Sequence, residues 1–303
     1  MTPAASAAAS VGIDVGGTFT KVCLVGPDGA VRRSVKVPTE SRREPAEFVR
    51  RLTAVIGGWR FASLGLGLAG GVDQEDGALF FAPNLKAWLG FPFKRVFERL
   101  LRVPVTAEND ANAAVWGGYV VALKKRPRHV VGLTLGTGVG SGLILDGRLH
   151  RGATRSAGEA GHQTLSPRGP LCRCGKRGCL EAYVGTRGIQ RAARRLMRRP
   201  PSPLTPKAVA EAARAGDPGA RRVWEEVGGW LGLAVANLCL VYDPEAVLLL
   251  GGVAQAGGLL LGPVRRVLDA QPFREPFERL ALRAPAGHDW GCVGAALLSR
   301  EAR

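Results

Sequence analysis

The stretch that decides the fold is residues 11–25, which read VGIDVGGTFTKVCLV. Val11–Val15 and Lys21–Val25 are rich in apolar and β-branched residues and predict two strands, and the adjacent glycines between them predict a tight turn. Residues 130–145, VVGLTLGTGVGSGLIL, show the same order of strand, glycine turn and strand. This coarse repeat indicates two related domains with a cleft between them.

The rest of the chain alternates short β-rich runs with stretches of helical spacing, which favours an α/β architecture. We expect strands at Ser63–Leu68, Val103–Ala107, Val130–Leu135, Ser141–Leu145 and Ala246–Leu250. We expect helices at Pro45–Ile56, Ala111–Val121 and Arg187–Arg199, and further helices that begin at the capping pairs Thr205-Pro206 and Asp217-Pro218.

Length and composition suit two soluble domains. The chain has 303 residues, of which 46% are hydrophobic. Its longest apolar run, Ala246–Leu250, is far too short to cross a bilayer, and Met1–Ser10 is expected to be a short disordered tail without the features of a signal peptide. We therefore expect a cytoplasmic protein, in which cysteines are thiols or metal ligands.

The net charge of +17 raises the alternative of a nucleic-acid partner. The basic residues are mostly Arg, however, and they are spread along the chain. In Arg187–Arg199 the apolar residues recur at helical spacing, so these arginines are typical of the solvated side of an amphipathic helix. We expect no nucleic-acid and no membrane partner.

The two glycine turns are candidate phosphate sites. In Asp14–Lys21 adjacent glycines let backbone N–H groups approach phosphate oxygens, and Asp14 could hold Mg²⁺ through water. Leu135–Gly142 has more glycines than a hairpin requires, which a loop in contact with a ligand would explain. A plain hairpin turn is the alternative for each, and neither segment contains the Gly-Lys-Ser/Thr of a P-loop.

A metal site is predicted by His162, Cys172, Cys174 and Cys179, which lie within 18 residues. Three thiolates and an imidazole form a tetrahedral Cys3His set for Zn²⁺. Because protein ligands would fill all four positions, the metal would be structural. The alternatives are a redox pair or a chance grouping of core cysteines.

Several carboxylates and a histidine suit a ligand with many hydroxyl groups. Glu159 and His162 lie three residues apart and would share a face of a helical turn, and Glu181 follows the last of the clustered cysteines. Asp110 ends an expected strand and begins an expected helix, where an N-cap is the structural alternative to a catalytic role.

Together these segments resemble the ROK family of repressors, open reading frames and kinases. The resemblance covers essentially the whole chain and rests on Asp14–Lys21, Glu108–Ala113, Leu135–Gly142, Gly158–His162 and Cys172–Glu181, in the family's order and spacing. It implies an actin-like (ribonuclease H-like) two-domain sugar kinase fold, with ATP and sugar in the cleft. The expected domains are residues 10–117 with a C-terminal helix at about 291–303, and residues 118–290 with the zinc site.

The resemblance also implies roles for single residues, with ATP, catalytic Mg²⁺ and structural Zn²⁺ as cofactors. Asp110 matches the catalytic base. The sugar-binding positions are matched by Asn84, Asn109, Asp110, Glu159, His162 and Glu181. The first phosphate segment is matched by Asp14, Gly16, Gly17, Thr18 and Lys21, the second by Gly136, Thr137 and Gly138, and the adenosine segment by Gly251 and Gly252.

The activity that these matches imply is ATP-dependent phosphorylation of a hexose. Glucose is the first choice, since it is the commonest substrate of short family members; N-acetylmannosamine, fructose or a polyphosphate donor are alternatives. Residues 152–157 and the loop at 68–71 depart from the family pattern and bear on which sugar is used. A ROK repressor would carry a helix-turn-helix before the first strand, and a non-catalytic sensor would be expected to lose Asp110 or the phosphate turns. Family members are often dimers or tetramers, so a homo-oligomer is expected.

Overall fold

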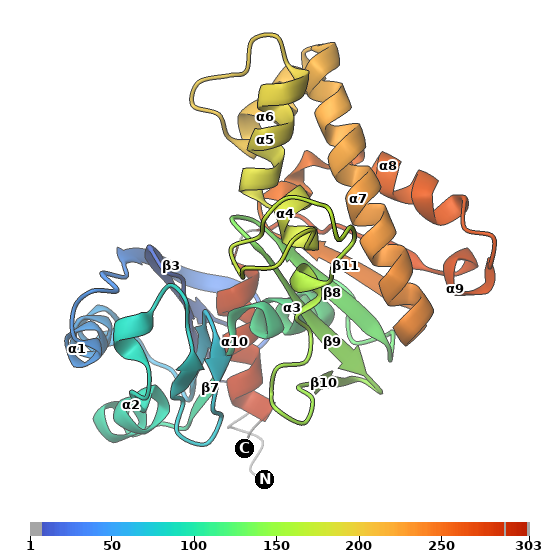
Figure 1. Cartoon of the computed structure of the whole chain (residues 1–303). Coiled ribbons are helices and arrows are strands. Elements are labelled where there is room, and N and C mark those ends of the chain that lie inside the picture. The colour runs from blue at the N-terminus through green and yellow to red at the C-terminus, as the bar shows by residue number, and fades with distance from the viewer. Residues whose placement is uncertain (1–7, 288, 302–303) are drawn as a thin grey trace. The chain divides into compact units, whose positions relative to one another are not determined.

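The computed structural model describes residues 8–287 and 289–301. Within them the chain divides into two compact units (Figure 1). Unit 1 comprises residues 8–126, 149–157 and 289–301, and unit 2 comprises residues 127–148 and 158–287. The expected boundary at residue 117 falls inside α3 (Asp110–Val121), which lies wholly in unit 1 because it packs along α10 (Trp290–Glu301). Residues 1–7 of the expected tail and 302–303 of the expected C-terminal helix lie outside the described residues.

Unit 1 contains a five-stranded sheet of order β3-β2-β1-β4-β7 in the described part of the chain. Its strands are β1 (Ser10–Val15), β2 (Phe19–Val25), β3 (Val31–Pro38), β4 (Leu64–Leu68) and β7 (Val105–Asn109). β2 is antiparallel to its two neighbours, β1 and β3. β4 is parallel to its two neighbours, β1 and β7. The predicted strands are all present, but β2 begins two residues earlier than expected, and β7 begins and ends two residues later than expected.

Helices cover both faces of this sheet. The core on one face joins β-strand side chains to Phe48 of α1 (Pro45–Ile56) and Phe93 of α2 (Phe93–Leu101). On the other face α10 approaches closely because β1 and β4 carry glycines there: a Cβ on Gly12 would lie 1.8 Å from the Cys292 carbonyl oxygen. Figure 1 shows α1 and α2 on one side of the sheet and α10 on the other.

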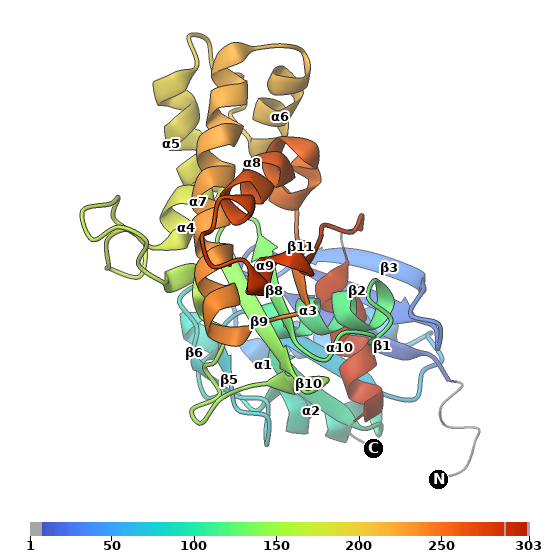
Figure 2. The same cartoon turned by 90° about the vertical axis from the view of Figure 1, so that its right-hand side faces the viewer.

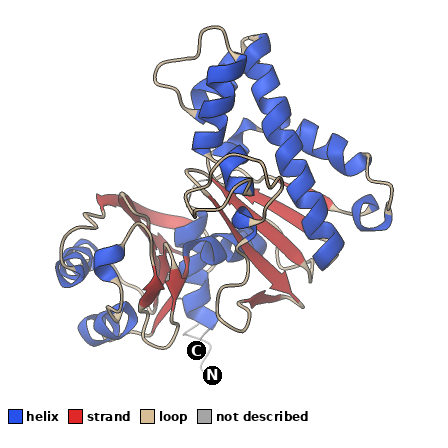
Figure 3. Ribbon diagram, viewed as in Figure 1, coloured by secondary structure: helices blue, strands red, loops and turns tan. Residues whose placement is uncertain are grey.

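Unit 2 repeats the sheet arrangement of unit 1. Its described strands form a second sheet (Figure 3). Their order is β10-β9-β8-β11-β12, where β8–β9 is antiparallel and β8–β11 and β11–β12 are parallel. They are β8 (Val130–Leu135), β9 (Val139–Leu145), β10 (Arg148–His150), β11 (Ala246–Leu250) and β12 (Ala281–Arg283). The repeat expected from the sequence is therefore present in both sheets.

The helices of unit 2 gather around α7 (Pro218–Tyr242), which contacts α5, α6 and α8 (Figure 2). The others are α4 (Leu180–Val184), α5 (Thr186–Leu196), α6 (Pro206–Arg214), α8 (Gly258–Asp269) and α9 (Glu275–Glu278). The predicted caps are confirmed, since Thr205 accepts a hydrogen bond from the Ala208 N–H and Asp217 accepts one from the Ala220 N–H.

Shorter elements complete the structure: β5 (Gly71–Val72), β6 (Leu79–Phe81), and the 3₁₀ turns η2 (Lys86–Trp88), η3 (Ala160–His162) and η4 (Val253–Ala256). The expected helix at 187–199 begins one residue earlier and ends at Leu196. In the part of the chain that the structure describes, no helix combines the length and the apolar character needed to span a membrane.

Candidate functional site

In unit 1 the candidate residues collect at one edge of the sheet. The parallel strands β1, β4 and β7 are in register, with Val15 beside Leu68 and Leu68 beside Asn109. Their carboxyl ends therefore open onto the same edge, which is where α/β sheets bind ligands. Two strand spacings of about 4.8 Å separate β1 from β7, so the first glycine turn lies about 10 Å from the start of α3.

The first glycine turn is held by Thr39. Its hydroxyl donates to the Gly16 carbonyl oxygen at 2.7 Å, and its backbone N–H donates to the Thr18 carbonyl oxygen at 2.9 Å. Thr18 itself is exposed. Gly17 lies directly against Asn84, since an added Cβ would be 2.9 Å from the Asn84 Cβ. The fold thus brings a predicted sugar contact beside the predicted phosphate turn.

Asp14 lies next to this turn in a desolvated environment. Burial raises the pKa of Asp14 to about 6, the nearby Lys21 opposes that shift, and Asp289 adds to it. Lys21 faces Asp14 across β1 and β2, and its Nζ forms an ion pair with Asp289 Oδ1 at 3.0 Å. Burial tends to lower the pKa of Lys21, but the hydrogen bond to Asp289 and the two carboxylates raise it above its ordinary value. The edge therefore holds a mixed charge cluster.

Asn109, and not Asp110, is the N-cap of α3. Asn109 Oδ1 accepts hydrogen bonds from the backbone N–H groups of Ala111 (2.9 Å) and Asn112 (3.0 Å), and its Nδ2 donates to the Gly70 carbonyl oxygen (3.0 Å). The structural alternative stated for Asp110 is thus wrong: Asn109 has the extended backbone of a cap, whereas Asp110 is already the first helical residue. Asp110 is half-buried, and its Oδ1 accepts a hydrogen bond from the Ala111 N–H at 2.9 Å.

Glu108, which precedes this pair, is a buried carboxylate to which the sequence analysis gave no role. It accepts hydrogen bonds from the Asn109 N–H (3.0 Å), from Asn112 Nδ2 (3.1 Å) and from Arg151 Nε (2.6 Å). Its side chain is 4% exposed. The signal that could have identified it is an acidic residue at an otherwise buried position of a strand.

In unit 2 the second glycine turn meets Glu181. Glu181 Oε2 accepts a hydrogen bond from the Val139 N–H at 3.1 Å, and a Cβ on Gly138 would lie 2.4 Å from the same oxygen. Glycine is therefore required at 138 while Glu181 stays in this position. Thr137 is exposed at the tip of the turn. Gly251 packs against the end of β8, where its Cβ would be 2.5 Å from the Leu135 carbonyl oxygen, so the predicted adenosine segment adjoins this turn.

The segment that carries Glu159 and His162 is fixed on β9. Ser141 donates its hydroxyl to the Gly158 carbonyl oxygen and accepts a hydrogen bond from the Ala160 N–H. The two predicted residues belong to a 3₁₀ turn, in which the His162 N–H donates to the Glu159 carbonyl oxygen at 3.0 Å. Glu159 is exposed and His162 is half-buried.

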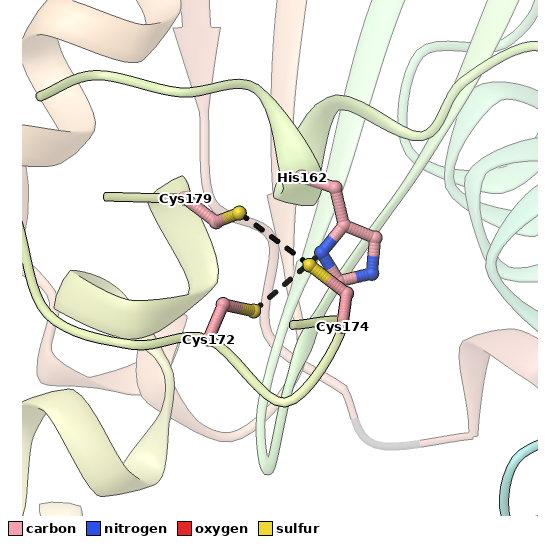
Figure 4. Close-up of side chains that lie close together, drawn as sticks. All are labelled: His162, Cys172, Cys174 and Cys179. Carbon is pink, nitrogen blue, oxygen red and sulfur yellow. Dashed lines mark hydrogen bonds between the residues drawn. The ribbon is translucent and has the colours of Figure 1, made fainter. Parts of the chain in front are cut away.

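The predicted metal ligands come together in unit 2 (Figure 4). One donor atom from each of His162, Cys172, Cys174 and Cys179 lies within 4.8 Å of all the others. His162 Nδ1 is 3.7 Å from Cys172 Sγ, and Cys174 Sγ is 3.6 Å from Cys179 Sγ. Tetrahedral zinc with bonds of about 2.0–2.3 Å requires donor separations of about 3.5–3.8 Å, which these two distances match, and thiolates with an imidazole are ligands that zinc prefers.

The cysteine loop also touches the second glycine turn through Glu181. Cys172 Sγ donates to Glu181 Oε1 at 3.6 Å, while the other carboxylate oxygen holds the Val139 N–H. Lys176 ties the loop to the His162 carbonyl oxygen at 2.9 Å. The metal cluster, Glu181 and the glycine turn consequently form one connected structure within unit 2.

The predicted site residues thus form one group in each unit. Unit 1 holds Asp14, Gly16, Gly17, Thr18, Lys21, Asn84, Asn109 and Asp110; unit 2 holds Gly136, Thr137, Gly138, Glu159, His162, Glu181, Gly251 and Gly252. Sequence reasoning missed the residues that support them: Thr39, Glu108, Arg151 and Asp289 in unit 1, and Thr186, which donates its hydroxyl to the Gly136 carbonyl oxygen, in unit 2.

Comparison with known proteins gives consistent matches along the chain. The model of the ROK family matches residues 10–302. A glucokinase of Streptomyces coelicolor is 35% identical over 314 residues, covering 96% of this chain and 98% of its own. An N-acetylmannosamine kinase of Escherichia coli is 32% identical over 293 residues, covering 96% and 98%. Among solved structures, a ROK family glucokinase from Streptomyces griseus in complex with glucose and AMPPNP superposes with a TM-score of 0.84 at 33% identity, covering 97% of this chain and 99% of that one.

Proposed function

This chain belongs to the ROK family and has its actin-like sugar kinase fold, and we propose that it transfers the terminal phosphoryl group of ATP to glucose, forming glucose 6-phosphate. The observation that carries the proposal is the edge of the unit 1 sheet, where Asp110 and the first glycine turn lie about 10 Å apart. That separation accommodates a sugar hydroxyl and a phosphoryl group in line. The glucokinase relative and the glucose-bound structure favour glucose as the acceptor.

Asp110 is the proposed general base. A sugar hydroxyl is a weak acid, so the base accepts its proton late, as the bond to phosphorus forms. The first position of α3 suits an ionised carboxylate, because the helix N-terminus stabilises negative charge there. Since Asn109 caps the helix, the Asp110 carboxylate does not have to perform that task.

The two glycine turns are proposed to bind the triphosphate. The donors would be the backbone N–H groups of Gly17, Thr137 and Gly138 together with the Thr18 hydroxyl. The Gly16 N–H already donates to the Phe19 carbonyl oxygen at 3.2 Å, so Gly16 would serve by its small size. Gly251 and Gly252 would contact the adenosine. Asp14 would hold Mg²⁺ through water, and that ion would neutralise charge on the phosphates when bound.

The residues proposed for sugar recognition are Asn84, Asn109, Asp110, Glu159, His162 and Glu181. Carboxylate oxygens have lone pairs for several O–H donors, so Glu181 can accept from a hydroxyl while it holds the Val139 N–H. Side chains placed to hydrogen-bond the hydroxyl groups of one sugar discriminate strongly against a sugar that lacks one of those hydroxyls. The side chain is then left without a hydrogen-bond partner.

Zinc is proposed as the structural metal of the cysteine loop. His162, Cys172, Cys174 and Cys179 would be its ligands, with His162 bound through Nδ1, the nitrogen that faces Cys172. His162 Nε2 would then be oriented for a sugar hydroxyl. The zinc would fix the loop that leads to Glu181 and so the position of a second sugar contact.

The proposal is tested with a panel of acceptors and donors. The purified protein is assayed for ADP release with glucose, N-acetylmannosamine and fructose, and glucose is then paired with polyphosphate in place of ATP. We expect the highest kcat/KM with glucose and ATP. A higher kcat/KM with N-acetylmannosamine, the substrate in the name of the E. coli relative, would assign the chain to that activity. The absence of sugar-dependent turnover throughout the panel would remove the kinase proposal.

The cellular setting follows from the same proposal. A kinase that uses ATP and Mg²⁺ is expected to act in the cytoplasm.

A homo-oligomer, dimer or tetramer, is also proposed. α7 exposes Leu240 and Val241, whose burial between subunits would be favourable. Sedimentation equilibrium of the full chain measures this directly.

A further inference from the structure

The buried carboxylate Glu108 lies directly before the Asn109-Asp110 pair and joins strand to helix. Its Oε1 accepts hydrogen bonds from the Asn109 N–H at 3.0 Å and from Asn112 Nδ2 at 3.1 Å. Asn112 belongs to the first turn of α3 and is itself buried. One carboxylate oxygen therefore links the end of β7 to the first turn of α3, on either side of Asp110.

The charge on Glu108 is compensated by Arg151. Arg151 Nε donates to Glu108 Oε2 at 2.6 Å, and it is the cation paired with Glu108 in the described part of the chain. The Glu108 side chain is 4% exposed, whereas that of Arg151 is 39% exposed. Loss of one partner of such a pair leaves a charge away from water, which is far less favourable than loss of an exposed pair.

Arg151 lies on a short segment that belongs to a different unit from the residues on either side of it in sequence. Residues 149–157 belong to unit 1, although the residues before and after them belong to unit 2. The segment is closed by a hydrogen bond from the Ala157 N–H to the Arg151 carbonyl oxygen at 3.0 Å. A second ion pair on it, Arg155 with Asp73 at 2.5 Å, is exposed on both sides, at 38% and 42%. Of the two ion pairs that join this segment to the rest of unit 1, the pair of Arg151 with Glu108 is therefore the one that includes a buried side chain.

We propose that Arg151 is a positioning residue for phosphoryl transfer: by holding and neutralising Glu108, it fixes the β7–α3 junction on which Asp110 is mounted. The proposal rests on the proposed function for the role of Asp110. Arg151 acts through Glu108 and touches neither sugar nor phosphate. A displacement of about 1 Å at a reacting group is enough to slow a reaction about 100-fold. A shift of this junction is therefore expected to lower kcat.

The first test compares Arg151→Met with the matched control Arg155→Met, which removes the exposed ion pair of the same segment. In Arg151→Met we expect kcat to fall about 10- to 100-fold, with the KM values for sugar and ATP changed less than about threefold. We also expect the acid limb of the kcat profile to move to higher pH, because an uncompensated carboxylate then lies near Asp110. Arg155 lies in the stretch 152–157 that bears on the choice of sugar, so Arg155→Met is free to change the KM for sugar, but the acid limb of its kcat profile is expected to stay in place.

The second test is rescue by Glu108→Gln in the Arg151→Met background. Glutamine keeps an oxygen for the Asn109 and Asn112 donors and needs no cation, so kcat should return to within about threefold of wild type. Arg151→Lys should also restore most of the activity. If neither change restores kcat, or if Arg151→Met mainly raises a KM, Arg151 acts on a ligand directly and the proposal is overturned. Unchanged kcat and pH profile in a destabilised Arg151→Met would mean a purely structural role.

The third measurement separates this inference from the proposed function. Hydrogen exchange of the amides at Ala111 and Asn112 reports on the junction without any substrate. We expect these amides to exchange at least about fivefold faster in Arg151→Met than in Arg155→Met. If wild type phosphorylates no sugar, the proposed function fails, and the exchange comparison still decides whether Arg151 holds the junction; equal exchange in the two variants would overturn it.

Discussion

Asn109 and Asp110 divide two tasks at the start of α3. Asn109 satisfies the backbone N–H groups of Ala111 and Asn112 and is held in turn by the Gly70 carbonyl oxygen. Asp110 follows as the first helical residue, where the helix N-terminus stabilises its charge. The cap thus holds the backbone while the next side chain performs the proposed proton transfer.

Asp110→Asn is expected to keep the fold and to lower kcat about 10²- to 10⁴-fold, because an amide cannot accept the hydroxyl proton. Circular dichroism and thermal unfolding check that the variant is folded, and a coupled ADP assay measures kcat. Asn109→Ala serves as the comparison: loss of the cap should lower stability by about 1 kcal/mol, and loss of the proposed sugar contact should raise the KM for glucose more than it lowers kcat. Near-normal turnover in Asp110→Asn would exclude Asp110 as the base.

The buried carboxylate of Asp14, which is proposed to hold Mg²⁺ through water, lowers the stability of the folded protein when it is ionised. Burial raises its pKa to about 6 from the ordinary 3.8, so between these pH values the folded state binds more protons than the unfolded chain. The stability contributed by this group is therefore present at low pH and is lost as pH rises toward and through 6. At pH 7 the ionised carboxylate lowers the free energy of unfolding by up to about 3 kcal/mol.

Asp14→Asn should accordingly raise the free energy of unfolding at pH 7, by up to about 3 kcal/mol, with little gain at pH 4. Urea unfolding at the two pH values measures this difference, and turnover should fall because the proposed Mg²⁺ contact is lost. Asp28→Asn is the control: a hydrogen bond from the Ala30 backbone lowers the pKa of Asp28, so no gain is expected there. A destabilised Asp14→Asn at pH 7 would contradict the account of this carboxylate.

At the scale of elements, sequence patterns correctly predicted the features that depend on residues close together in the chain. The strand–turn–strand pattern at residues 11–25, the caps Thr205 and Asp217, and the grouping of His162 with the three cysteines were all predicted from spacing. The alternative that made Asp110 the cap of α3 lies one residue too late, because Asn and Asp have nearly equal preference for that position and only backbone geometry separates them.

The cysteine loop, residues 172–179, is expected to hold about one zinc per chain, measured by elemental analysis of the purified protein. Cys174→Ser should lose zinc, since a neutral hydroxyl replaces a thiolate ligand, and should lower the thermal midpoint and turnover together. Cys239→Ala, which removes a buried cysteine of α7 outside the cluster, should retain full zinc. Full zinc and full activity in Cys174→Ser would contradict the proposed ligand set.

At the scale of the whole molecule, the family and the actin-like fold were predicted from the motifs and are confirmed. The place of residues 149–157 in unit 1 could not be predicted. It depends on contacts such as Arg151 with Glu108, which are 43 residues apart in sequence. Periodicity and motif spacing report on neighbours along the chain, whereas an ion pair between distant segments leaves no regular pattern. The supporting residues Thr39 and Asp289 were missed for the same reason.

The activity proposed for this chain is the transfer of a phosphoryl group from ATP to glucose. The most direct measurement is ³¹P NMR of the wild-type protein with ATP, Mg²⁺ and glucose. We expect ADP and glucose 6-phosphate to appear in equal amounts, with ATP stable when glucose is omitted. ATP that stays intact with glucose present, or that is hydrolysed to free phosphate at the same rate with and without glucose, would contradict it.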